Sequence, residues 1–433
     1  MKRDWITFTI GFVLVLAVTV AIADREVIVN GKRLSGNELA RLEQIHCGAI
    51  PDGRYWLDED TGHWGRQGES APLGNIRENC QKSTEVPPPS KRNGFSPPAA
   101  NGGGTPSTST KKVMVEVFYA TDRKASLSEK PFYGTERGEV QLGVCEISIP
   151  PDHKMGELEA PKWWKLEFRE DPEKHVVLRS VNPLPTSEFY PKVRSRVEHS
   201  SNREAFVFVH GYNVTFEDAA RRTAQMAYDL GFEGAPILYS WPSQGSLVKY
   251  TIDETNVDWS APHLKEFLAE LSANTGARTI HLIAHSMGNR ALVAALREMA
   301  SERPVPLTFR ELVLAAPDID AEIFKRDVVP KIQQMAKRIT LYASSGDEAL
   351  QASKKVHGSP RAGDAGSGLM VITGVDTIDA SYVDTSLVGH SYYGDNRSVI
   401  ADLYQLFRQD VPPSRRNLVS REYRGGKYWE FRR

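Results

Sequence analysis

The stretch TIHLIAHSMGNRALVAALREM, residues 279–299, decides the fold. It opens with an apolar run, Thr279 to Ala284, that has the length of a buried strand, and helix-forming residues begin at Asn289. Between them lie His285, Ser286, Met287 and Gly288, which leave room only for a tight turn. The sequence therefore predicts a strand, a sharp turn and a helix, with Ser286 on the turn.

This pattern is typical of the nucleophile elbow, G-x-S-x-G, in which a serine is held at a strained apex. Small residues two positions before and after the serine keep Cβ atoms clear of the neighbouring backbone, and the helix N-terminus points at the reacting oxygen. Gly288 fills the second small position, while Ala284 replaces the first glycine. The alternative interpretation is an ordinary buried strand followed by a helix.

Further strands and helices alternate along the chain. This predicts an α/β fold, a mostly parallel sheet wound on both faces, with functional residues at the carboxyl ends of the strands. Helices are expected from Thr215 to Leu230, from Ser260 to Gly276 and from Ser391 to Phe407. Besides the elbow strand, strands are expected at 113–118, 141–149, 205–209, 236–240, 311–315, 338–343 and 369–373.

One connection, residues 242–259, is long enough to suggest a lid over the active edge of the sheet. Trp241, Tyr250 and Trp259 would either line an apolar pocket there or simply pack beneath the loop. The pattern leaves both interpretations open.

The 433 residues carry a net charge of −1, which does not favour a nucleic-acid partner. At 40% hydrophobic residues, the chain has material for one large domain and smaller pieces. The large α/β domain is expected at 112–412, followed by a basic and aromatic tail at 413–433. We expect that tail to be solvated or to form an edge strand.

The N-terminus has the pattern of an export signal. Lys2 and Arg3 precede an apolar run, residues 6–23, that ends in Ala-Ile-Ala. This predicts that residues 1–23 are a signal peptide or, if uncleaved, a membrane anchor. Either way the rest of the chain would be periplasmic, or attached to the cytoplasmic membrane through residues 6–23 and facing outward.

Residues 24–82 are expected to form a small module with short strands near Val27 and Tyr55 and a helix from Ser35 to Leu42. Its aromatic residues are more suited to a miniature core than to a binding face. Cys47 and Cys80 would form a disulfide in an oxidising compartment, or remain two reduced thiols. A Pro-, Gly- and Ser-rich linker follows at 83–111.

Acyl transfer by a serine needs a base and an orienting carboxylate. In hydrolases of this architecture the chain order is Ser, then Asp or Glu, then His. Only His357 and His390 follow Ser286, and we favour His390 because it lies after the last strand and opens the final helix. A histidine that merely caps the helix is the alternative.

The carboxylate has two candidates, each after a predicted strand. Asp347 follows 338–343 and Asp318 follows 311–315; we favour Asp347, since Gly346 lets the backbone turn it inward. Asp320 is a third, more distant choice.

The developing oxyanion needs two backbone donors. We expect the N–H of Met287 and the N–H of Tyr212, because Gly211 permits a close turn after the strand 205–209. His210 would shape this loop, and His285 would be structural. The reaction requires no metal or organic cofactor.

Seven separated motifs in this order resemble the bacterial α/β-hydrolase family DUF900, over about residues 113–408. They are VFYATDR (117–123), IPPDHKMGELEAP (149–161), FVHGYNVTFEDAARR (208–222), IAHSMGNRAL (283–292), LAAPDID (314–320), YASSGDEAL (342–350) and GHSYY (389–393). The resemblance implies a serine hydrolase fold with Ser286, Asp347 and His390 on the triad positions, and it leaves the substrate undefined. The segment 55–58 resembles a short module of other exported bacterial proteins.

These observations predict an exported serine esterase or related acyl hydrolase that acts on small-molecule or lipid esters through an acyl-enzyme. An acyltransferase would use the same residues. The other class is a non-catalytic relative that binds the cell envelope.

Overall fold

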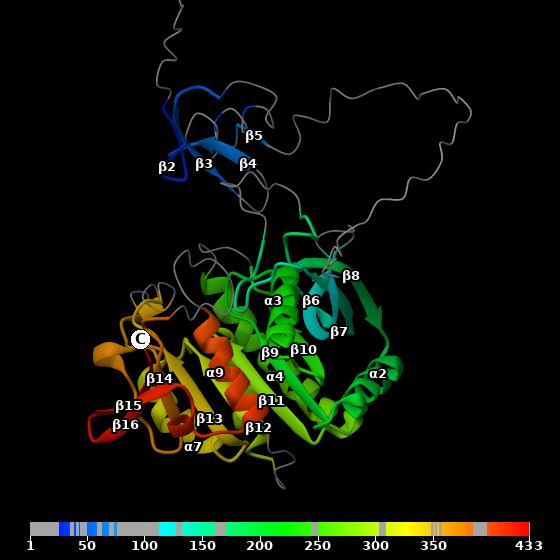
Figure 1. Cartoon of the computed structure of the whole chain (residues 1–433), viewed down its shortest axis with the longest axis vertical. Coiled ribbons are helices and arrows are strands. Elements are labelled where there is room, and N and C mark those ends of the chain that lie inside the picture. Colours follow the sequence, from blue (N-terminus) through cyan, green and yellow to red (C-terminus); the bar gives the residue numbers. More distant parts are fainter. Residues whose placement is uncertain are drawn as a thin grey trace, which may run out of the picture. The chain divides into compact units, whose positions relative to one another are not determined.

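The structure is a computed structural model of the whole chain (Figure 1). It describes residues 26–34, 39, 43, 50–58, 63–68, 73–75, 112–126, 132–160, 170–244, 250–302, 309–347, 350, 353, 354, 357–383 and 396–432. The chain divides into two compact units, a small N-terminal one and a large one that spans residues 104–160 and 170–433.

The small unit is built on a five-stranded sheet in the order β2-β1-β3-β4-β5. Its core contains Tyr55, and Trp64 packs against that core from the next strand. Trp56 lies over Gly65, where an added Cβ would be 2.6 Å from the indole ring. The strands are β1 (Val27–Val29), β2 (Lys32–Arg33), β3 (Gly53–Leu57), β4 (His63–Arg66) and β5 (Gly74–Asn75).

The large unit is organised by an 11-stranded sheet in the order β15-β16-β14-β13-β12-β11-β9-β10-β6-β7-β8. The central strands from β14 to β6 are parallel, and antiparallel pairs close both edges. The strands are β6 (Val113–Ala125), β7 (Tyr133–Ile149), β8 (Val177–Leu184), β9 (Glu204–Val209), β10 (Ala235–Ser240), β11 (Thr279–His285), β12 (Phe309–Ala315), β13 (Ala336–Ala343), β14 (Asp376–Asp379), β15 (Leu418–Tyr423) and β16 (Gly426–Phe431).

Helices cover both faces of this sheet. The apolar faces of α2, α4, α5 and α7 join one core cluster, and those of α3 and α9 join the other. Figure 1 shows α9 crossing the sheet in front of β12 and β13. The helical segments are α2 (Thr186–His199), α3 (Phe216–Asp229), α4 (Tyr250–Thr275), α5 (Gly288–Met299), α6 (Ala321–Ile323), the π-helix η4 (Phe324–Val328), α7 (Val329–Ile332), α9 (Asn396–Gln409) and the 3-10 turns η5 (Gly366–Gly368) and η6 (Pro413–Arg415).

The order of the strands fixes where a site can form. From β9 the chain passes to β10 on one side, and then returns across β9 to β11 and continues outward through β12, β13 and β14. The loops after β9 and β11 therefore leave in opposite directions at adjacent carboxyl ends. Crevices that bind ligands in open α/β sheets lie at such switch points.

Most expected elements are present, and two predictions are wrong. Residues 369–373 do not form a strand; the strand that pairs with β13 is β14, a few residues later. The long connection expected at 242–259 is mostly helix, because α4 begins at Tyr250 and runs through Pro262. The described part of the connection before α4 is therefore only residues 242–244, and residues 245–249 lie outside the described ranges.

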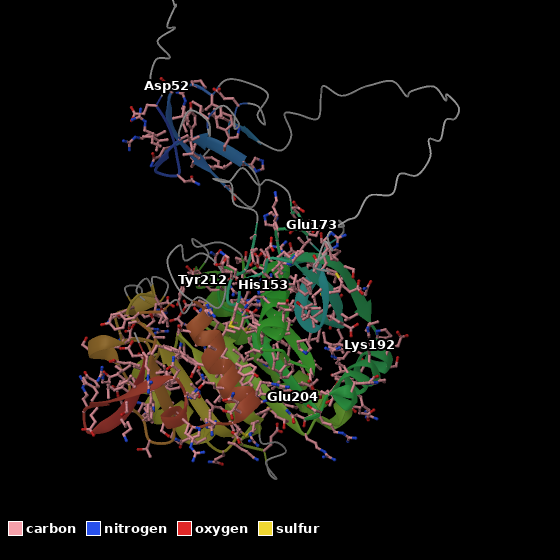
Figure 2. All side chains as sticks on the ribbon, viewed as in Figure 1. Asp52, His153, Glu173, Lys192, Glu204 and Tyr212 are labelled. Carbon is pink, nitrogen blue, oxygen red and sulfur yellow. The ribbon has the colours of Figure 1, made fainter. Side chains whose placement is uncertain are left out.

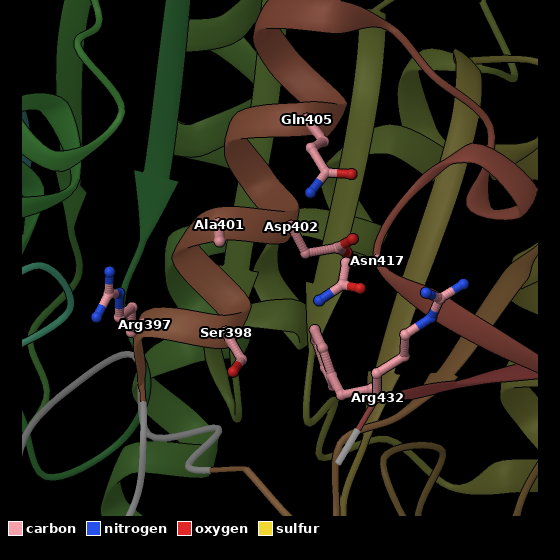
Figure 3. A pocket seen from close by; sticks show the side chains of 8 residues that line it. Arg397, Ser398, Ala401, Asp402, Gln405, Asn417 and Arg432 are labelled. Carbon is pink, nitrogen blue, oxygen red and sulfur yellow. The ribbon is translucent and has the colours of Figure 1, made fainter.

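The basic and aromatic tail contributes strands to the sheet. β15 and β16 form an antiparallel hairpin, and β16 runs parallel to β14. The hairpin and α9 line an open hollow of about 300 Å³, and Asp402 and Asn417 are among the residues that line it (Figure 3). No predicted site residue lines it.

Several predictions concern residues outside the described ranges. These are the N-terminal segment 1–23, both Cys47 and Cys80, the linker 83–111, most of the helix 35–42, the stretch 391–395 and His390. Across the part of the chain that the structure describes, no helix is both long and apolar enough to cross a bilayer.

Candidate functional site

Ser286 stands at the turn between β11 and α5 with a backbone φ of 47°. For a residue other than glycine, this left-handed conformation costs about 1–3 kcal/mol and persists only where the surroundings fix it. Here the N–H of Ser286 donates to the carbonyl of Ala315 at 2.9 Å. The carbonyl of Ser286 accepts from the side-chain amide of Asn289 at 2.9 Å and from the N–H of Asp318 at 3.2 Å. The strained serine is thus held from both sides.

The two small positions of the elbow have different requirements. A Cβ at Gly288 would lie 2.2 Å from the carbonyl oxygen of His210, so only glycine fits there. Ala284 lies within β11, paired with Val209 and Leu314, and it is not among the residues with positive φ. A methyl group is therefore tolerated at the position where the motif usually has glycine.

The loop after β9 packs directly on the elbow. A Cβ at Gly211 would lie 3.0 Å from the Cβ of Ser286 and 2.8 Å from the ring of His285, so the backbone here approaches as closely as glycine allows. Tyr212 follows on the same loop and is labelled in Figure 2. Among the described residues, no hydrogen bond uses the N–H of Tyr212 or of Met287.

His210 is fully buried and holds this loop against β10. Its ring stacks on Trp241 with 5.2 Å between centroids, and the indole N–H of Trp241 donates to the carbonyl of His210 at 2.8 Å. Burial, reinforced by the charge of Arg123, holds the pKa of His210 well below its ordinary value, so the ring is neutral. Trp241 is completely buried and packs rather than lining a pocket.

His285, next to the nucleophile, is buried against α3. Burial, with the charge of Arg222, lowers its pKa to about 4. Neither ring nitrogen has a hydrogen-bond partner within the described residues. A neutral imidazole in this position adds no charge beside Ser286.

Asp318 lies beside the elbow, but its carboxylate is already engaged. Oδ1 accepts from the hydroxyl of Ser353 at 2.5 Å and from Nε of Arg361 at 2.8 Å. Oδ2 accepts from the hydroxyl of Tyr250. Burial by itself raises the pKa of Asp318, but the guanidinium groups of Arg290 and Arg361 outweigh it and lower the pKa. Asp318 is therefore a buried counter-ion.

Asp347 lies on the loop after β13 and is only partly buried. Its Oδ1 accepts from the N–H of Leu350 at 2.9 Å. The loops after β9 and β13, which carry Tyr212 and Asp347, leave from the same edge of the sheet because the strands between them are parallel. Burial raises the pKa of Tyr212, and the charge of Asp347 raises it further. His390, the expected partner of Asp347, lies outside the described residues.

The segment 361–364 joins the loops that carry the two aspartates. Gly363 donates to the carbonyl of Pro317 at 2.9 Å, and its own carbonyl accepts from Ser344 at 2.9 Å. A Cβ at Gly363 would lie 2.5 Å from Ala316, so this contact requires glycine. The loops after β12 and β13 are thus linked by a third strand-like segment.

The other histidine downstream of Ser286 is engaged elsewhere. His357 contacts Glu254 through Nε2 at 2.7 Å and the carbonyl of Ser353 through Nδ1 at 2.8 Å. Asp320, the third choice for the acid, caps α6 by accepting from two backbone N–H groups. Within the described structure, neither residue makes a hydrogen bond to Ser286 itself, although His357 also lies 3.3 Å from the hydroxyl of Ser353, which donates to Asp318.

Sequence reasoning missed residues that support the elbow from a distance. Asn289 and Arg290 directly follow the elbow in the motif 283–292, so their position in the sequence could have indicated a supporting role. Arg290 donates to the carbonyl of Asp318 at 2.7 Å. Arg361 and Arg123 gave no local signal, because their partners are far away in the chain. Among the described residues, no group of three or more His, Cys, Asp and Glu side chains is arranged to hold a metal ion.

A mostly parallel sheet wound on both faces, with a strained serine between a strand and a helix at the switch point, defines an α/β-hydrolase. The chain belongs to the family described as alpha/beta hydrolase of unknown function (DUF900), which matches residues 186–409. The resemblance seen in the sequence motifs is therefore confirmed. No curated protein matches the chain. Membership in this family suggests hydrolytic chemistry and leaves the substrate open.

Proposed function

We propose that the protein is a serine hydrolase that cleaves carboxylic esters through an acyl-enzyme. Ser286 attacks the carbonyl carbon, His390 takes the hydroxyl proton and returns it to the leaving alcohol, and Asp347 orients the imidazole. Water, activated by the same histidine, then releases the acid. The conclusion rests on one observation: the strained Ser286 lies in contact with the loop after β9.

The geometry around Ser286 supports an oxyanion hole. The N–H of Met287 lies at the start of α5, where the helix dipole favours negative charge. The N–H of Tyr212 belongs to the loop that Gly211 brings against the serine. Neither N–H is used within the described structure, so both are available to a developing oxyanion.

The contacts of Asp318, and the order of the loops, favour Asp347 as the acid. The carboxylate of Asp318 already accepts from a buried arginine and two hydroxyl groups, so orienting a histidine would require it to give these up. Asp347 lies on the later loop, after β13, and so follows Ser286 and precedes His390 in the chain order Ser, Asp, His. We therefore assign Asp347 to the triad and Asp318 to the support of the elbow.

We further propose that residues 1–23 direct export and that the substrates are small-molecule or lipid esters of the periplasm or membrane surface. The basic start and the apolar run at 6–23 are the support for export. A fusion of residues 1–30 to a reporter that is active only outside the cytoplasm tests it. An inactive reporter would contradict export.

Labelling by a fluorophosphonate tests the nucleophile. The wild-type protein should be labelled, Ser286→Ala should not, and the surface variant Ser201→Ala should be labelled like wild type. Hydrolysis of p-nitrophenyl butyrate should fall in Ser286→Ala by up to about a millionfold, to background. Equal labelling of wild type and Ser286→Ala, or none in either, would overturn the proposal.

Substitution of the remaining candidates tests the triad. His390→Ala should reduce kcat by about a millionfold, like loss of the serine. Asp347→Asn should reduce it by about four orders of magnitude, as loss of an orienting carboxylate does in related triads. Asp318→Asn should chiefly reduce stability. A larger loss of kcat from Asp318→Asn than from Asp347→Asn, at equal folding, would reverse the assignment.

A further inference from the structure

We propose that Arg123 is a positioning residue that holds the oxyanion loop, residues 210–214, in register with Ser286. This inference rests on the proposed function. Arg123 lies in the motif 117–123, outside the residues 186–409 that define the family. With this role for Arg123, the antiparallel pair β6–β7 near the edge of the sheet contributes to catalysis.

The side chain of Arg123 is buried at the carboxyl end of β6, with 1% of its surface exposed. β6 pairs with β10 up to Thr121, and the hydroxyl of Thr121 donates to the carbonyl of Ser240 at 2.6 Å. A buried guanidinium is costly unless its donors are used. Here all three nitrogens donate to neutral oxygen atoms from separate segments.

Two of these contacts reach the oxyanion loop. At the end of the loop, Nη2 of Arg123 donates to the carbonyl of Val214 at 2.8 Å. At its start, Nε donates to the hydroxyl of Ser240 at 2.9 Å, and that hydroxyl lies 3.1 Å from Nε2 of His210. Since Nδ1 of His210 faces the carbonyl of Gly211 at 2.8 Å and donates to it, Nε2 accepts from Ser240. One guanidinium therefore fixes both ends of the loop.

The other contacts of Arg123 tie the loop to its surroundings. Nη1 donates to the carbonyl of Ser243 and to that of Gly134, each at 3.0 Å. The hydroxyl of Ser243 accepts from the N–H of Val214 at 3.2 Å and donates to Asp253 on α4 at 2.7 Å. Both backbone groups of Val214 are thus held, and Tyr212 lies between the fixed ends of the loop.

The chemistry of arginine suits this position. Its planar fork presents five donors in fixed directions, whereas lysine offers one freely rotating ammonium group. Burial lowers the pKa of Arg123 to about 10, which the nearby carboxylates Glu217, Asp122 and Asp253 partly oppose, so the group is charged at neutral pH. The same charge helps to keep His210 neutral, which the hydrogen bond from Ser240 requires.

The test measures catalysis separately from folding. Arg123→Lys should reduce kcat for p-nitrophenyl butyrate by about 100-fold. Ser240→Ala, which removes the hydroxyl shared by Arg123 and His210, should reduce it by about 10-fold. In both variants KM should change less than about threefold. A misplaced oxyanion donor weakens the transition state more than the ground state. The rate of fluorophosphonate labelling should fall in parallel with kcat.

Arg416→Lys is the matched control, because Arg416 is also a buried arginine but pairs with Asp402 beneath the C-terminal hairpin. It should lose stability and keep wild-type kcat. If Arg123→Lys and Arg416→Lys lose stability equally and neither changes kcat, or if KM rises as much as kcat falls, Arg123 is only structural. Failure of the proposed function is a separate result, in which wild type itself shows neither hydrolysis nor labelling.

Discussion

Replacing His153 by glutamine should weaken the large unit at neutral pH and below, and hardly at all above pH 9. The ring of His153, labelled in Figure 2, lies between two carboxylates: Nδ1 is 2.7 Å from Glu159 and Nε2 is 2.8 Å from Asp229. Carboxylates only accept, so both ring nitrogens must carry protons and the imidazole is charged. With 2% of its side chain exposed, this cation joins the loop 150–160 to the end of α3.

The magnitude follows from the change in pKa. Burial by itself lowers the pKa of His153, but the hydrogen bonds with Asp229 and Glu159 outweigh it and raise the pKa from 6.5 to about 9. A difference of one pKa unit between the folded and unfolded states corresponds to about 1.4 kcal/mol, so the charged form of His153 stabilises the fold by up to about 3 kcal/mol. Because the folded pKa is the higher one, this stability is complete below pH 6.5 and is lost as the pH rises through about 9.

Urea unfolding of wild type and His153→Gln, followed from pH 6 to pH 10, measures this contribution. The difference in free energy of unfolding should be about 2 to 3 kcal/mol at pH 7 and approach a small constant value at pH 10. His199→Gln, at the exposed end of α2, controls for general effects of pH. A difference that stays constant from pH 7 to pH 10 would show that the charge of His153 between Glu159 and Asp229 does not stabilise the fold.

Three further substitutions test the elbow and the base of the sheet. Gly288→Ala should cost about 1–3 kcal/mol of unfolding free energy and reduce kcat at least about 100-fold, because the added Cβ would meet the carbonyl of His210. Wild-type activity in this variant would contradict the elbow geometry. Asn289→Ala should lower the free energy of unfolding by about 1–3 kcal/mol, because it removes the side-chain amide that donates to the carbonyl of Ser286. A change of less than a few tenths of a kcal/mol would show that the strained turn does not need this hydrogen bond. Burial raises the pKa of Glu311 to about 7, so its ionisation destabilises the fold as pH rises from 4.5 through 7. Glu311→Gln should therefore gain about 3 kcal/mol at pH 8.5 and less than about 1 kcal/mol at pH 5, and equal gains at both would rule this out.

The local pattern of the sequence determined the element that carries the nucleophile. An apolar run, a turn with Gly288 and helix formers after it specify strand, turn and helix without outside help, and Thr215 three residues before Asp218 specifies the start of α3. Both are short-range effects, since sterics at one turn and a side chain bonding the next backbone N–H depend only on neighbours. The alternation of strands and helices likewise indicates a parallel sheet, because consecutive parallel strands need a crossover helix between them.

Only the tertiary structure decided which side chains meet. Asp318 and Asp347 both follow strands, and their roles differ because Arg361 folds back onto Asp318 from 43 residues away. Arg123 reaches Ser240 across 117 positions, and His153 reaches Asp229 across 76. Spacing along the chain carries no record of such pairs, because their energy comes from burial that exists only after the sheet and its helices have packed. For the same reason, the start of α4 and the place of β14 followed from packing rather than from local preference.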